Sequence, residues 1–165
     1  MLAGISSTVM AKDIAEYKQE RLIAKILNQQ VKKHRTIQSS VHSILSRYPE
    51  KVEIAIRAEP AYAQEIVNTA VKFNPSEIEN IVRIAIRTEP YDTSNIVNNT
   101  ASSYPSKMLN ILTAAITAIP EQASNIVKDI LAIFPNQADT VVKTAIIQSK
   151  DNQYEGIVNA AIDSG

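Results

Sequence analysis

Cysteine and tryptophan are absent from this 165-residue sequence, and there are only three glycines and two histidines. Without cysteine the chain has no disulfide framework, no thiol nucleophile and no thiolate metal site. The glycines, Gly4, Gly156 and Gly165, are too scattered to form a glycine-rich phosphate loop. His34 and His42 have no partner at metal-ligand spacing. We therefore expect a protein that is not an enzyme and that holds neither a metal nor another cofactor.

Net charge and long apolar runs are also missing. The 17 basic residues balance 17 acidic ones, which is not typical of a dedicated nucleic-acid binder. No apolar run approaches the roughly 18 residues that a membrane-spanning helix needs. Hydrophobic residues nevertheless make up 45% of the chain, too much for a disordered protein and enough for a folded core.

Proline is the residue that organises the sequence. Six of the seven prolines follow one another at intervals of 15 residues: Pro60, Pro75, Pro90, Pro105, Pro120 and Pro135. A fixed period of this kind is the signature of a repeat protein. With the proline numbered as position 1, apolar residues recur at positions 4, 7, 8, 11 and 12, which form one face of an α-helix. Each unit is therefore predicted to be one helix of about three turns, with proline in its first turn and a tight turn before the next helix.

Two kinds of turn alternate along the repeats. Aromatic residues mark the turns Tyr48-Pro49, Phe73-Asn74-Pro75, Tyr104-Pro105 and Phe134-Pro135, and are missing from Glu59-Pro60, Glu89-Pro90 and Ile119-Pro120. Alternation implies that successive turns lie at two opposite edges, so that units pair as αα-hairpins of about 30 residues. We predict an all-α protein, an α-solenoid with an N-terminal helical cap, whose turn aromatics have a structural packing role.

The sequence divides into three parts. Residues 1–11 are a signal-peptide remnant or a frayed N-terminus, residues 12–48 are predicted to form a helical cap, and residues 49–165 form the repeat array. In the last unit Asp151 takes the place of proline, after one inserted residue. Its apolar residues follow the pattern of the interior units, so we expect its outer side to expose an apolar surface that favours association.

This layout resembles the α-solenoid class that includes tetratricopeptide and HEAT proteins. The resemblance is confined to the layout, because those repeats run about 34 and 40–47 residues and the tetratricopeptide Trp-Leu-Gly-Tyr signature is missing here. It implies no functional residues for this chain.

Two groups of polar residues are candidates for an interaction surface. Position 6 is occupied by Asn80, Asn95, Asn110 and Asn125, almost opposite the apolar face. These side chains are interpreted either as a ladder that bonds the turn or a side chain of the neighbouring helix, or as a polar stripe for a protein or glycan. The second group is a basic cluster, Lys32, Lys33 and Arg35, which is also explained by a solvated helix C-terminus.

Charge is distributed unevenly between the two parts of the chain. Residues 1–58 carry ten basic and five acidic side chains, a net +5, and residues 59–165 carry seven and twelve, a net −5. We therefore favour a structural protein that self-assembles head to tail into a ring or filament. The alternative is a monomeric binding module whose long surface holds a protein, peptide or glycan partner.

The first residues also bear on localisation. Val9-x-Ala11 fits the small-residue rule of a secretory cleavage site, although a basic segment before it is missing. If these residues are a signal remnant, the mature chain begins near Lys12 and we expect a bacterial periplasmic, cell-surface or extracellular matrix protein. Otherwise we expect a cytoplasmic one.

Overall fold

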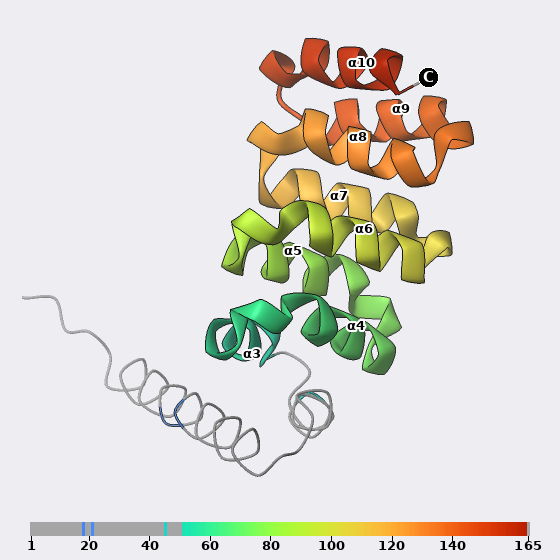
Figure 1. Cartoon of the computed structure of the whole chain (residues 1–165). Coiled ribbons are helices and arrows are strands. Elements are labelled where there is room, and N and C mark those ends of the chain that lie inside the picture. The colour runs from blue at the N-terminus through green and yellow to red at the C-terminus, as the bar shows by residue number, and fades with distance from the viewer. Residues whose placement is uncertain (1–17, 19–20, 22–44, 46–50, 165) are drawn as a thin grey trace, which may run out of the picture.

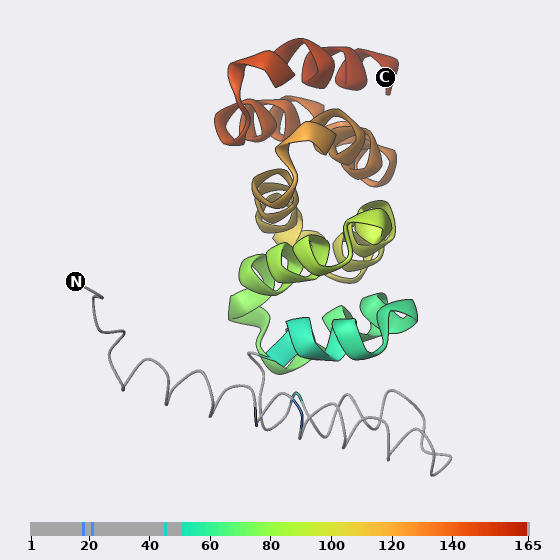
Figure 2. The ribbon, with the colours of Figure 1, turned by 90° about the vertical axis from the view of Figure 1, so that its left-hand side faces the viewer.

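The computed structural model describes Lys18, Arg21, Leu45 and residues 51–164. Throughout residues 51–164 every regular element is helical. The α-helices are α3 (Val52–Ala58), α4 (Ala63–Phe73), α5 (Ile78–Thr88), α6 (Thr93–Ser103), α7 (Met108–Ala118), α8 (Ala123–Ile133), α9 (Ala138–Gln148) and α10 (Tyr154–Asp163). Figures 1 and 2 show these helices stacked from α3 at one end to α10 at the other.

A short 3₁₀ helix precedes each α-helix from α4 onward. These are η2 (Pro60–Tyr62), η3 (Pro75–Glu77), η4 (Pro90–Asp92), η5 (Pro105–Lys107), η6 (Pro120–Gln122), η7 (Pro135–Gln137) and η8 (Asp151–Gln153). Each proline thus begins a 3₁₀ turn, and the α-helix itself begins at position 4, three residues later than the sequence suggested. The η8 turn confirms that Asp151 occupies the proline position of the last unit.

The helices form two layers. The odd-numbered helices α3, α5, α7 and α9 pack in sequence in one layer, and the even-numbered helices α4, α6, α8 and α10 pack in sequence in the other. Consecutive helices also pack against each other across the layers. This arrangement confirms the predicted all-α solenoid of paired helices. The predicted cap of residues 12–48 lies outside the described residues, apart from Lys18, Arg21 and the fully buried Leu45.

The predicted repeat positions form the core. In α5 the five buried residues are Ile78, Ile81, Val82, Ala85 and Ile86, at positions 4, 7, 8, 11 and 12. The same five positions are buried in α4, α6, α7 and α8. Because small and large aliphatic side chains alternate on this face, neighbouring helices approach closely and exclude water.

The two kinds of turn lie at opposite edges of the stack. Phe73 is the last residue of α4, and Tyr104 and Phe134 directly follow α6 and α8. All three are half-buried and pack against the core. The hydroxyl of Tyr104 also donates a long hydrogen bond of 3.4 Å to the carbonyl oxygen of Asn68 in α4. These contacts agree with a structural packing role for the turn aromatics.

Candidate interaction surfaces

The position-6 asparagines lie on the outside of both layers. Asn80, Asn95, Asn110 and Asn125 are all exposed. Asn80 and Asn110 belong to α5 and α7 in one layer, whereas Asn95 and Asn125 belong to α6 and α8 in the other. Because position 6 points away from the core, the four residues form two short rows on opposite faces instead of one stripe.

The hydrogen bonds of these asparagines are local. Arg83 Nη2 donates to Asn80 Oδ1 at 2.8 Å, and Asn95 Nδ2 donates to Asp92 Oδ1 at 2.6 Å. Asn99 Nδ2 donates to the Asn95 carbonyl oxygen at 2.9 Å. Between residues 51 and 164, no side-chain hydrogen bond joins one of these asparagines to a neighbouring helix. These hydrogen bonds of Asn80 and Asn95 thus stay within one helix and the turn before it, and both the ladder and the binding stripe stay predictions.

Lys32, Lys33 and Arg35 lie outside the described residues, so the basic cluster stays a prediction as well. Among the residues that are described, no group of three or more histidine, cysteine or carboxylate residues is placed to hold a metal ion. None of the described helices combines the length and hydropathy that a membrane span requires.

Positions 8 and 12 identify one end of the stack as an apolar surface. Both positions are buried in every helix from α4 to α8, as Val67, Val71, Val82, Ile86, Val97, Ala101, Leu112, Ile116, Val127 and Leu131. In α10 the same two positions are Val158, which is 40% exposed, and Ile162, which is 70% exposed. In α9 they are Val142 and Ile146, which are half-buried.

The burial pattern shows which way these positions point. Ile157 and Ala160, at positions 7 and 10 of α10, are buried on the side that faces α8. Positions 8 and 12 lie on the other flank of the helix and face the place of the next helix in the layer. We call Val142, Ile146, Val158 and Ile162 the C-terminal end face. Val158 and Ile162 are thus apolar side chains exposed on the outer side of the last described helix, as the repeat pattern predicted.

Ile147 adds to the apolar surface beside this face. It occupies position 13 of α9 and is 77% exposed. In the five preceding units, position 13 is Lys72, Arg87, Ser102, Thr117 and Ala132, all exposed and polar or small. A large aliphatic side chain at this position therefore departs from the repeat pattern. The 15-residue period does not predict an apolar residue there.

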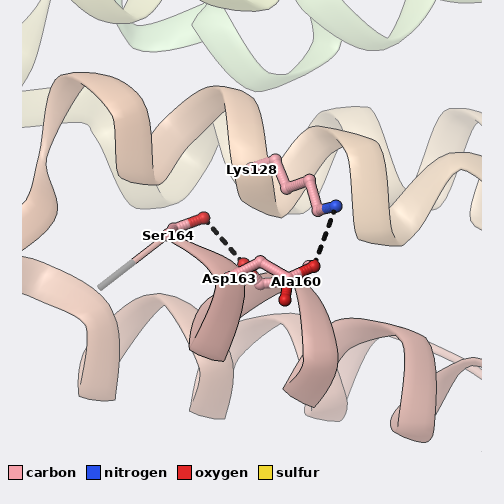
Figure 3. A network of polar contacts seen from close by, with 4 residues as sticks. All are labelled: Lys128, Ala160, Asp163 and Ser164. Atoms are coloured by element: carbon pink, nitrogen blue, oxygen red, sulfur yellow. Dashed lines mark hydrogen bonds and ion pairs between the residues drawn. The ribbon is translucent and has the colours of Figure 1, made fainter.

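Helix α10 is held closely against α8 (Figure 3). Lys128 Nζ lies 3.3 Å from Asp163 Oδ2, and both side chains are about half exposed or more, so this ion pair contributes little to stability. Gly156 occupies position 6, where asparagine stands in four earlier units. A Cβ atom at Gly156 would lie 2.5 Å from Ser124 Oγ of α8. The missing side chain therefore permits the close approach of α10 to α8.

A comparison of the chain with protein-family models, curated proteins and solved structures finds no match. The contacts and exposures of the described residues therefore carry the functional argument.

Proposed function

We propose that this chain is a non-enzymatic α-helical repeat protein that self-assembles as a structural component. The C-terminal end face is the observation that carries the proposal. Val158 and Ile162 repeat the positions that interior helices bury, but in α10 they are exposed. A surface that matches the interior of the repeat array is suited to pack against another helical layer.

Two arrangements of the copies are compatible with such a face. In a head-to-tail arrangement, the face contacts the N-terminal part of the next copy, and repetition grows a ring or filament. The net +5 of residues 1–58 and the net −5 of residues 59–165 favour this arrangement. In a tail-to-tail arrangement, the face contacts the same face of a second copy and the assembly closes.

The mass of the full chain in solution tests self-assembly. We expect light scattering to give a multiple of the 18.1 kDa chain at micromolar concentration. Long polymers that shorten as salt is raised would support head-to-tail pairing of opposite charges, since salt screens exposed charges. A mass of one chain at every concentration and salt would contradict self-assembly.

We also propose that the protein acts outside the cytoplasm, as a periplasmic, cell-surface or extracellular matrix component. Val9-x-Ala11 is the support for this proposal. Expression in a secreting bacterium followed by mass measurement is the test. A mature chain that begins near Lys12 is the expected product, and an uncleaved chain retained in the cytoplasm would contradict export.

A monomeric binding module is the second candidate function. Its support is the exposure of the position-6 asparagines and of Tyr91, which is 99% exposed in the η4 turn. Capture of a protein or glycan partner by the monomer, with loss of capture in Asn80→Ala/Asn110→Ala or Asn95→Ala/Asn125→Ala, would favour it. Unchanged capture by both variants would remove the asparagine rows from consideration.

A further inference from the structure

We draw no further inference here: the strongest candidate, the apolar surface patch of Val142, Ile146, Val158 and Ile162 on α9 and α10, already belongs to the proposed self-assembly, and nothing in the structure shows which surface covers it.

Discussion

The residue before each of the six regularly spaced prolines makes backbone hydrogen bonds to two successive helices. The N–H of Tyr104 donates to the Thr100 carbonyl oxygen at 2.9 Å and closes α6, and its own carbonyl oxygen accepts from the Lys107 N–H at 2.9 Å and opens η5. Its backbone angles, φ −130° and ψ 64°, lie outside the α region, as proline requires of the residue before it. A single residue therefore ends one helix through its N–H and begins the next turn through its carbonyl oxygen.

Gly156 gives a prediction at the residue scale. Alanine in a helix interior is favoured over glycine by about 1 kcal/mol. A Cβ at this position would lie 2.5 Å from Ser124 Oγ, so part of that gain is lost to the contact. We expect Gly156→Ala to raise the free energy of unfolding by about 1 kcal/mol in a Ser124→Ala background, and by clearly less when Ser124 is present. Urea denaturation of the four proteins in this cycle measures the difference.

The control in this cycle is Ser124→Ala alone, which removes the hydroxyl without changing the glycine. Equal effects of Gly156→Ala in the two backgrounds would show that the hydroxyl moves aside without cost. The close approach of α8 and α10 would then not depend on glycine.

At the scale of the element, α6 differs from the other interior helices in burying two threonines. It buries Thr93, Thr100 and Ala101 where α8 buries Ala123, Ile130 and Leu131. Most of its other residues are serine and asparagine, which are poor helix formers.

Local unfolding should therefore begin at α6. Hydrogen exchange followed by mass spectrometry is expected to give lower amide protection for peptides from α6 than for peptides from α8, the next helix in the same layer. Equal protection of the two helices would show that the stack opens as one unit.

The fold could be predicted from the sequence because helix, break and core repeat with the same period. Ile81 and Val82 have equivalents in each interior unit, so an atypical residue in one unit does not hide the pattern that the other units show. The 3₁₀ turns were not predicted, because proline is compatible with the first turn of either kind of helix. The alternation of aromatic turns correctly indicated two edges, since Phe73 and Tyr104 pack at the same edge only if the units pair.

The candidate site was only partly predictable. Asn80 and Asn95 have the same position in a 15-residue unit, but the fold repeats in space every two helices, which places them in different layers. The end face could be predicted from Val158 and Ile162, because residues at positions 8 and 12 leave the same side of the helix in every unit, including the last. Ile147 was missed, because its only signal is an aliphatic residue at a position that is otherwise polar or small.

For the whole molecule, the energetics of the end face decide whether copies associate. Full burial of a valine or isoleucine side chain contributes about 1.5–3 kcal/mol. Val158 and Ile162 are 40% and 70% exposed, so covering them in a contact between copies gains only part of this amount for each side chain. This gain opposes the loss of translational and rotational freedom, about 4–15 kcal/mol, so a stable dimer needs the whole face to pack closely.

The most direct test of this account compares the mass of the unmodified chain with that of Val158→Thr/Ile162→Gln, measured by light scattering over a range of concentrations. Leu109→Gln is the matched control, because Leu109 of α7 is 38% exposed, close to the 40% of Val158, and is not part of the end face. The account predicts a multiple of the 18.1 kDa chain for the unmodified protein and the control, and one chain for the end-face variant. An oligomer that survives in the end-face variant, or an unmodified protein that is monomeric throughout, would contradict it.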